Sequence, residues 1–282
     1  MLFILENRMK IGVYYTELTR GPGKVASNLI KGLEKIGADF SVNSEGDFNI
    51  ILHGGSERIN SNLGNCLIGP NLSTLPIDSG IVMNTNSYMK IIVHSDWVKN
   101  LYSRWIPEEK IIVWPVGIDT ELFRDTRLEK KEYDFLIYYK RRSGEDLDRI
   151  KRFLDDKGKK YTVINYGNYS EGDFINTIKK SKYGIVVNNT ESQGIAICEM
   201  LSSNIPLLVW DVKKWEDRGN ENACNATSIP FWDRRCGEFF YDYNEMNEKY
   251  DIFVENEYSP RNYILSNLEL GEQAKKIINY FG

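Results

Sequence analysis

Histidine and cysteine are scarce in this sequence, and their scarcity excludes several kinds of site. The 282 residues include two histidines and four cysteines. The four cysteines match neither a CxxC pair nor the spacing of a zinc site: Cys66, Cys198, Cys224 and Cys236. Because only His53 and His94 could add to them, we expect no metal site. Reduced thiols and a cytoplasmic location are the simplest interpretation.

Long apolar runs and a surplus of basic residues are also absent. No apolar stretch approaches the roughly 20 residues that cross a bilayer, and the apolar run in residues 1–10 is too short for a signal peptide. Lys and Arg number 36 against 40 Asp and Glu, which gives a net charge of −4. We therefore expect no nucleic-acid partner. The length suits two compact domains rather than one small core.

In the first half of the chain, short apolar runs alternate with amphipathic segments. Residues 23–37 place their apolar side chains on one helical face, which predicts a helix. Strand and helix that alternate over short links predict parallel βαβ units. The remaining predicted elements are strands at 10–15, 48–55, 65–70 and 110–118, and a strand that runs into a helix at 90–105.

A charged stretch at 125–134 interrupts this alternation and is the candidate linker. The pattern then resumes, with strands predicted at 134–139, 160–167, 183–189 and 205–211, helices at 145–158, 173–182 and 194–204, long loops at 212–245, and an amphipathic helix at 267–282. We predict two α/β domains, 1–126 and 127–264, followed by a C-terminal helix at 265–282. Domains of this kind bind ligands at the carboxyl ends of their strands, so residues at strand ends are candidates.

The first candidate is "TRGPGKVASN", which follows the first predicted strand. Gly21 and Gly23 would let the backbone approach a ligand, and the start of a helix favours an anion. The stretch matches neither GxGxxG nor the Walker A pattern. An ordinary turn between strand and helix therefore remains the alternative.

The second candidate is "YYKRRSGED", after the strand that opens the second half. Lys140, Arg141 and Arg142 could together hold a diphosphate; the alternative is a solvated run of charge. Asp146 and Asp148 resemble a metal-binding DxD. They fall in the first turn of a predicted helix, where carboxylates complement the helix dipole, so we expect no metal there.

The third candidate is a pair of glutamates, Glu191 and Glu199, around the start of the predicted helix at 194–204. Amides near Gly194 and Ile195 can bind a phosphate, and a glutamate on each side can accept hydrogen bonds from hydroxyls. The alternative is a helix-start acid followed by a surface acid. The apolar neighbours of Glu199 argue against full exposure, and a buried carboxylate needs a partner.

At these residues the sequence resembles the retaining nucleotide-sugar glycosyltransferases of the GT-B fold, most closely glycosyltransferase family 4. Glu191 and Glu199 in "ESQGIAICEM" match the family's E-x7-E. "IIVWPVGIDTELF" resembles its "PNGVD…F" segment, "GPGK" takes the place of its glycine-rich loop, and "SPRNYI" that of its late helix. The resemblance covers most of the chain, and the motifs are more specific together than alone.

The resemblance implies two Rossmann-like domains that face a cleft, with the last helix crossing back to the first domain. It places Glu199 on the donor ribose, Glu191 on the transferred sugar, and the amides of Gly194 and Ile195 on the diphosphate. A cation among Lys140, Arg141 and Arg142 would neutralise the leaving group. No metal or cofactor is implied, and the donor would be a UDP- or GDP-sugar.

Two points depart from the family. The usual "GR…K" is replaced by "YKRR", and the N-terminal half is short. The family's N-domain histidine has two candidates, His53 and His94, which both end strands. The expected activity is transfer of a sugar, with retention, to a glycan, lipid or small-molecule acceptor.

Three alternatives remain open. One is a nucleotide-sugar epimerase of the same fold, and another is a non-enzymatic nucleotide-sugar-binding protein. The third adds peripheral membrane contact through a basic aromatic patch of Trp97, Lys99, Arg104 and Trp105. Packing of these tryptophans in the core is the simpler interpretation.

Overall fold

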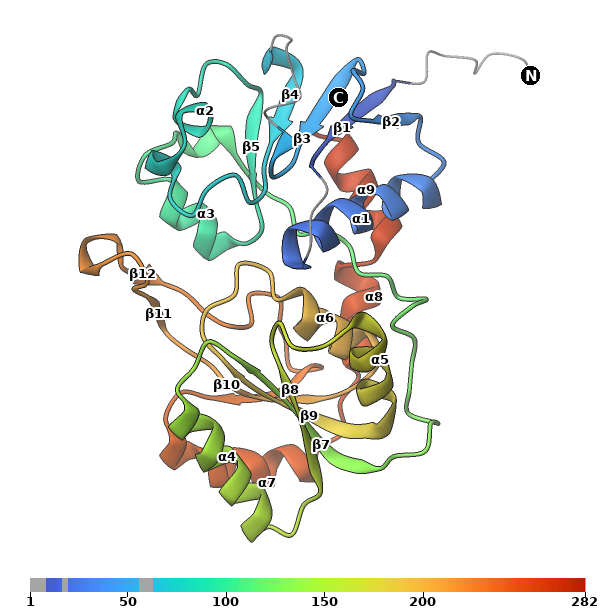
Figure 1. The fold of residues 1–282 in the computed structure, drawn as a ribbon, viewed down its shortest axis with the longest axis vertical. Helices are drawn as coiled ribbons and strands as arrows, with labels where there is room; N and C mark the ends of the chain where they lie inside the picture. Colours follow the sequence, from blue (N-terminus) through green and yellow to red (C-terminus); the bar gives the residue numbers. More distant parts are fainter. Residues whose placement is uncertain (1–8, 17–19, 56–62, 282) are drawn as a thin grey trace. The chain divides into compact units, whose positions relative to one another are not determined.

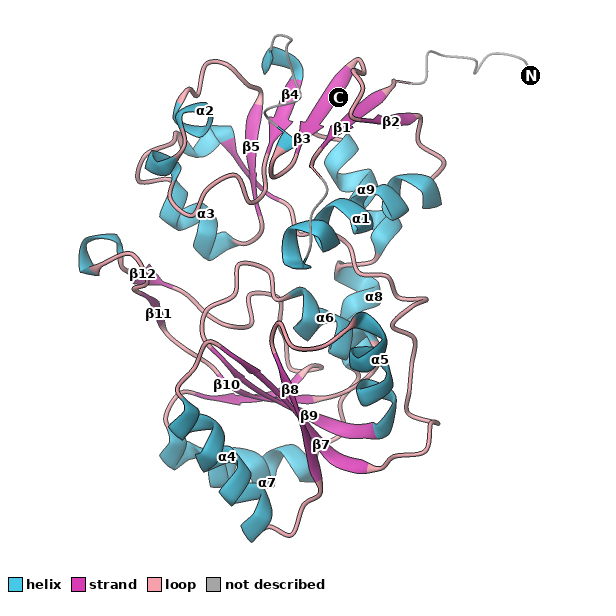
Figure 2. Ribbon diagram, in the orientation of Figure 1, coloured by secondary structure: helices cyan, strands magenta, loops and turns pink. Residues whose placement is uncertain are grey.

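The structure is a computed structural model that describes residues 9–16, 20–55 and 63–281. The chain forms two compact units (Figure 1). The first consists of Met1–Gly117 and Leu270–Gly282, and the second of Ile118–Glu269. Each unit is built on a parallel sheet with helices packed against it (Figure 2). The predicted α/β class with two Rossmann-like units is confirmed.

The sheet of the first unit has six strands in the order β2-β1-β3-β4-β5-β6, and every adjacent pair is parallel. Their bounds are β1 Ile11–Tyr14, β2 Phe40–Val42, β3 Phe48–Ile51, β4 Cys66–Ile68, β5 Lys90–Val93 and β6 Ile111–Val113. Strands β1 and β4 are buried throughout. Strands covered on both faces have continuous apolar sequences, which is why these runs were visible without strict alternation.

The helices of the first unit include the last helix of the chain. Their bounds are α1 Arg20–Lys35, α2 Gly80–Met83, α3 Asp96–Tyr102 and α9 Leu270–Ile278, with short 3-10 turns at Leu63–Asn65, Pro76–Asp78 and Glu108–Lys110. Helix α9 packs on α1 so closely that a Cβ at Gly32 would lie 2.8 Å from the carbonyl oxygen of Leu270. Trp114 Nε1 donates to the carbonyl of Gln273 (2.9 Å). The C-terminal helix thus returns to the first unit, as the resemblance implies.

The sheet of the second unit has five parallel strands in the order β13-β10-β9-β7-β8. Its strands are β7 Tyr133–Lys140, β8 Tyr161–Asn165, β9 Ser181–Asn188, β10 Leu207–Trp210 and β13 Gly237–Phe240, and β11 Lys214–Trp215 pairs separately with β12 Cys224–Asn225. The helices are α4 Gly144–Asp156, α5 Glu171–Lys180, α6 Ile195–Ser202, α7 Met246–Glu255 and α8 Pro260–Asn267, with 3-10 turns at Asn220–Asn222 and Tyr243–Glu245.

The prediction of long loops over 212–245 is wrong at β13. Its sequence, GEFF, contains only two apolar residues, so its apolar pattern is too short to indicate a strand, whereas the equally short β10 is apolar throughout. Strand β13 forms by pairing with β10, which is a contact that the local sequence does not encode.

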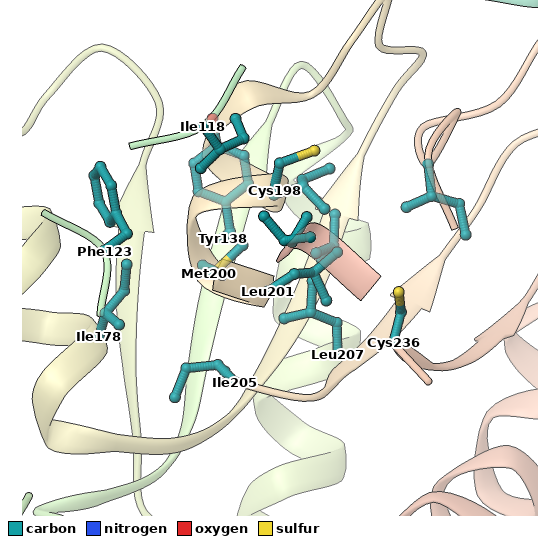
Figure 3. Packing of buried hydrophobic residues seen from close by; sticks show 14 of the residues in the cluster. Ile118, Phe123, Tyr138, Ile178, Cys198, Met200, Leu201, Ile205, Leu207 and Cys236 are labelled. Atoms are coloured by element: carbon teal, nitrogen blue, oxygen red, sulfur yellow. The ribbon is translucent and has the colours of Figure 1, made fainter. Parts of the chain in front are cut away.

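The sheet of the second unit separates two hydrophobic clusters. Helices α5, α6 and α8 supply one cluster, part of which Figure 3 shows, together with Tyr138 and Val186 of the sheet. Helices α4 and α7 supply the other, together with Trp210 and Phe240. Because neighbouring residues of a strand point to opposite faces, a residue's place in its strand decides which set of helices it meets.

The chain passes from one unit to the other at 117/118 and 269/270, whereas the sequence predicted domain boundaries at 126/127 and 264/265. The segment after Gly117 is already part of the second core. Phe123 packs against Phe174 with ring centroids 6.4 Å apart, and Thr126 Oγ1 donates to the carbonyl of Ser203 (3.0 Å). Arg261 of α8 donates to the carbonyls of Phe123 and Ser202. These contacts explain why 118–126 and α8 lie in the second unit.

Candidate functional site

At the carboxyl edge of the second sheet, a row of polar residues follows the last core residues on the face that packs against α6. On β7, Tyr138 is in the core and Lys140 comes two residues later. On β9, Val186 is followed in the same way by Asn188. Lys140 and Asn188 are direct partners in the strand register, so their side chains leave the sheet next to each other.

Two further residues continue this row. Tyr166 comes one residue after β8, and Lys140 Nζ lies 4.3 Å from the centre of its ring. Asp211 comes one residue after β10. Neither these two nor Asn188 was predicted as a site residue. The signal that would have found them is strand parity, because each continues an alternating apolar row beyond the core.

Glu191 lies at the centre of the row. Its Oε1 accepts hydrogen bonds from Lys140 Nζ (2.5 Å) and from Asn188 Nδ2 (2.6 Å). The Lys140 and Glu191 side chains are each only 11% exposed, so solvent screens this ion pair weakly. The backbone amide of Glu191 donates to the carbonyl of Thr227 (3.1 Å).

Asp211 fixes the loop that carries Thr227. It is buried, and it accepts hydrogen bonds from the Thr227 hydroxyl (2.8 Å) and from the amide (2.7 Å) and hydroxyl (2.8 Å) of Ser228. Thr227 in turn accepts from Glu191 through its carbonyl. The end of β10 therefore supports the turn that positions Glu191, through a loop distant from it in the sequence.

Helix α6 begins beside this cluster. Gly194 precedes the helix with φ 73° and ψ 51°, a left-handed conformation that glycine adopts most easily. The amide of Cys198 bonds back to the carbonyl of Gly194 (3.0 Å). The amides before it in the first turn have no acceptor within the helix, and no acidic side chain lies in that turn. This helix start is therefore suited to an anion.

Glu199 is buried in α6, with 3% of its surface exposed, so the interpretation as a surface acid does not hold. Burial raises the pKa of the neighbouring Cys198 thiol strongly, and the charges of Cys236, Glu199 and Glu191 raise it further. Glu191 lies four residues before α6 and Glu199 is the fifth residue of the helix, so the E-x7-E pair spans the first half of α6.

Arg142 lies on the other face of the sheet. Its guanidinium stacks on the Trp210 ring (4.2 Å), which belongs to the α4 and α7 cluster. It donates to the carbonyls of Asn188 (3.1 Å) and Trp210 (2.9 Å) and to Asp146 (3.1 Å). Burial lowers the pKa of this guanidinium, and the charge of Asp146 opposes the change. Arg142 thus makes its contacts on the side of α4 and α7, whereas Lys140 contacts Glu191 and Tyr166 on the side of α6.

Arg141, between these two cations, is exposed and has φ 52°. This left-handed residue lets the chain turn between Lys140 on one face and Arg142 on the other. Arg141 therefore stays available at the carboxyl edge.

Among the residues that the structure describes, no three His, Cys, Asp or Glu side chains gather as metal ligands would.

In the first unit, the rings of both histidines lie within hydrogen-bond distance of one residue, Asn71. His53 follows β3, His94 follows β5, and Asn71 follows β4 between them. His53 Nδ1 lies 2.5 Å from the carbonyl oxygen of Asn71, and His94 Nε2 lies 3.2 Å from its Oδ1. His94 is buried and His53 is exposed. The sequence did not indicate Asn71, which has φ 67°.

The glycine-rich stretch of the first unit lies inside a helix. Gly21 and Gly23 fall in the first two turns of α1, and residues 17–19 before them lie outside the described part of the chain. A Cβ at Gly21 would meet no atom of the described residues within 4 Å.

The predicted basic aromatic patch is only partly solvent-exposed. Trp97 and Trp105 are half-buried, and Lys99 pairs with Glu108 at 2.7 Å. Among the described helices, none combines the length and the apolar character that crossing a membrane requires.

No protein-family model matches the sequence, and no curated protein matches it. Solved structures do. An alpha-glucosyltransferase in complex with UDP and a 13-mer DNA has a TM-score of 0.63 at 11% identity, over 98% of this chain and 100% of that one. AviGT4, a glycosyltransferase involved in avilamycin A biosynthesis, has a TM-score of 0.59 at 12% identity, over 97% of each chain. The chain has the GT-B fold.

A third GT-B match is a mutant of S. aureus TarM in complex with fondaparinux, alpha-GlcNAc-glycerol and UDP. Its TM-score is 0.54 at 15% identity, over 92% of this chain. The chain spans only 59% of the length of TarM, although it spans nearly all of AviGT4. At these identities the likeness establishes the GT-B fold and leaves substrates to be argued from the site.

Proposed function

We propose that this GT-B chain transfers a sugar from a nucleotide-diphosphate sugar to an acceptor, with retention of anomeric configuration. The observation that carries the proposal is the cluster of Lys140, Glu191 and Asn188 at the carboxyl edge of the second sheet, beside the start of α6, where Gly194 has no side chain to cap the helix. Carboxyl edges of parallel sheets are where α/β domains bind nucleotides. The GT-B relatives include proteins solved with UDP.

The chemistry requires a stabilised diphosphate leaving group more than a strong base. The first-turn amides of α6, from Ile195 onward, and the ammonium of Lys140 are preorganised donors for that charge. They supply positive potential without a metal ion, so the proposed reaction is metal-independent. Arg141 adds an exposed cation at the same edge.

The two glutamates then act as hydroxyl acceptors. Glu191 would bind the transferred sugar, and Glu199 the donor ribose. Glu191 precedes the start of α6 and Glu199 follows it, so the two flank a single anion site on one unit. Their roles therefore differ from those of a glycosidase acid–base pair, whose carboxyl groups flank the scissile bond. The donor base would be uracil or guanine.

The acceptor is assigned to the first unit, where polar side chains also gather at the carboxyl edge. His53 is exposed, and Asn71 holds it through Nδ1. A histidine fixed at one nitrogen can present the other to a hydroxyl. A glycan, a lipid headgroup or a small molecule could provide that hydroxyl. Peripheral membrane contact, an alternative that the sequence leaves open, is relevant to the lipid headgroup.

The first experiment is thermal stabilisation by UDP, GDP, UDP-glucose and GDP-mannose, with wild type beside Glu199→Ala. The exposed Glu248 of α7 provides the matched control, Glu248→Ala. A ligand at about 100 times its dissociation constant adds roughly 2.7 kcal/mol to the free energy of unfolding. We expect one nucleotide to stabilise wild type and Glu248→Ala but not Glu199→Ala. If none stabilises the wild type, the proposal fails.

Product analysis then separates the remaining functions. A transferase consumes the donor in proportion to the acceptor supplied, and the product anomer reports retention. An epimerase converts the donor without an acceptor. Donor binding with no turnover in a broad acceptor panel would favour a non-enzymatic binding protein.

A further inference from the structure

Asn188 is the least accessible residue of the polar cluster. It ends β9, none of its surface is exposed, and it is paired in register with Lys140. Its Nδ2 donates to Glu191 Oε1 (2.6 Å), the same oxygen that accepts from Lys140 Nζ (2.5 Å). Two neighbouring strands thus direct one neutral and one charged donor at a single carboxylate oxygen.

The other end of this carboxamide has no comparable role. Asn188 Oδ1 is buried and makes no hydrogen bond to the residues that the structure describes. A buried carbonyl without a partner costs free energy. An apolar side chain would avoid that cost, as Val186 does two residues earlier in the same row. The bond from Nδ2 to Glu191 is what distinguishes asparagine from an apolar residue here.

The backbone of Asn188 is also held in place. Its carbonyl accepts a hydrogen bond from Arg142 (3.1 Å), and Arg142 bonds the carbonyl of Trp210 on the next strand (2.9 Å). The amide therefore projects from a strand end that is braced from the opposite face. Because Nδ2 carries no charge, it can direct the carboxylate without adding to the charge of Lys140.

We propose that Asn188 is a positioning residue, which orients Glu191 so that the carboxylate can accept a hydroxyl of the transferred sugar. The inference rests on the proposed function. Without the amide, Lys140 alone would hold Glu191, and a flexible lysine does not define one carboxylate orientation. The loss should fall on contacts with the sugar and spare contacts with the diphosphate.

The test compares dissociation constants for a nucleotide sugar and for its nucleoside diphosphate by titration calorimetry. The probes are UDP with UDP-glucose and GDP with GDP-mannose, and the pair that wild type binds is carried forward. Asn188→Leu keeps the branched shape and removes the donor. The matched control is Asn189→Leu, because Asn189 is the neighbouring asparagine whose Oδ1 accepts from the amide of Thr190 (2.9 Å).

We expect Asn188→Leu to weaken the nucleotide sugar about tenfold, the value of one hydrogen bond to a charged group. The nucleoside diphosphate should change by less than about twofold, and Asn189→Leu should change neither. In a Glu191→Gln background, Asn188→Leu should add no further loss of sugar affinity, since the amide acts through Glu191.

Equal weakening of both ligands would mean general damage to the site and would overturn the inference, as would no change in either. A wild type that binds none of the four probes would overturn the proposed function, and the inference with it. Thermal midpoints confirm that each variant is folded. Asn188→Ser, whose hydroxyl is shorter than the amide, replaces the leucine variant if that one does not fold.

Discussion

Lys140 and Arg142 lie on opposite faces of the same sheet, although one residue separates them. Lys140 contacts Glu191 and Tyr166 on the side of α6, and Arg142 stacks on Trp210 on the side of α4. The left-handed Arg141 between them makes the turn. Two cations that the sequence treats as equivalent therefore have different surroundings and, we expect, different functions.

Lys140→Met should weaken nucleoside diphosphate binding by about 1.5–3 kcal/mol, the value of a charge-assisted hydrogen bond. Arg142→Met should instead lower the free energy of unfolding by about 1–3 kcal/mol, because the carbonyls of Asn188 and Trp210 lose a donor. Calorimetry and urea denaturation measure the two effects. The double variant Lys140→Met/Glu191→Gln is the control, because it removes the carboxylate charge together with the ammonium that pairs with it. A larger loss of binding in Arg142→Met than in Lys140→Met would contradict this assignment.

Gly194→Ala should distort the start of α6. The left-handed backbone there disfavours alanine by roughly 1–2 kcal/mol, and a Cβ would contact Ile197 at 3.4 Å and Glu191 at 3.5 Å. We expect a lower thermal midpoint and weaker nucleotide binding. Gly144→Ala at the first position of α4 is the control: no described atom lies within 4 Å of its Cβ position, and φ is not positive. It should add about 0.4–1 kcal/mol of stability. Unchanged binding in Gly194→Ala would count against the helix start as the anion site.

Substitution of the two histidines should separate function from stability. His94→Ala removes a buried ring bonded to Asn71 and should lower the free energy of unfolding by about 1–3 kcal/mol. His53→Ala removes an exposed ring and should change stability by less than about 0.5 kcal/mol, while it slows transfer to the acceptor. Donor affinity serves as the control and should be unchanged in His53→Ala. Full transfer activity in that variant would remove His53 from the acceptor site.

Stability should fall at alkaline pH because three thiols are buried. Burial raises the pKa of Cys66 to about 11 and of Cys236 to about 12, and it raises the pKa of Cys198 as well. Unfolded thiols ionise near pH 8.5. Above that pH the unfolded state loses protons that the folded state keeps, so the free energy of unfolding should decline as pH rises toward 11.

Urea denaturation at pH 7.5 and pH 10 measures this decline, and Cys66→Ala should reduce its slope. A thiol reagent at pH 8 gives an independent check. It should modify the half-buried Cys224 in the native protein. The three buried thiols should react only after unfolding. Prompt modification of more than one thiol in the native protein would contradict the burial.

Much of the second unit could be predicted from the sequence. The apolar runs that became β7, β9 and β10 are continuous enough to be recognised from the sequence. Most of the residues of these strands are buried in the structure. Helix α6 begins within one residue of its predicted start, since Gly194 marks it. By contrast β13 was missed, because it forms only through its pairing with β10.

The candidate site divides in the same way. Glu191, Gly194 and Glu199 lie within nine residues, so local spacing and residue type indicated them. Asn188 adjoins the same segment, but its importance depends on which strand lies beside β9, since only that register puts it next to Lys140. Asp211 acts through Ser228, a residue far along the chain, and no local pattern indicates that bond.

The sequence by itself determined the alternation of strands and helices and the residue types at the carboxyl ends of the strands, because hydrophobic periodicity and helix-start chemistry are local properties. Only the tertiary structure decided which cation meets Glu191 and which histidine stays exposed. It also decided that the last helix joins the first unit, through Trp114 and Gln273. These outcomes depend on strand order and on the packing of distant segments, whose energies no short stretch of sequence contains.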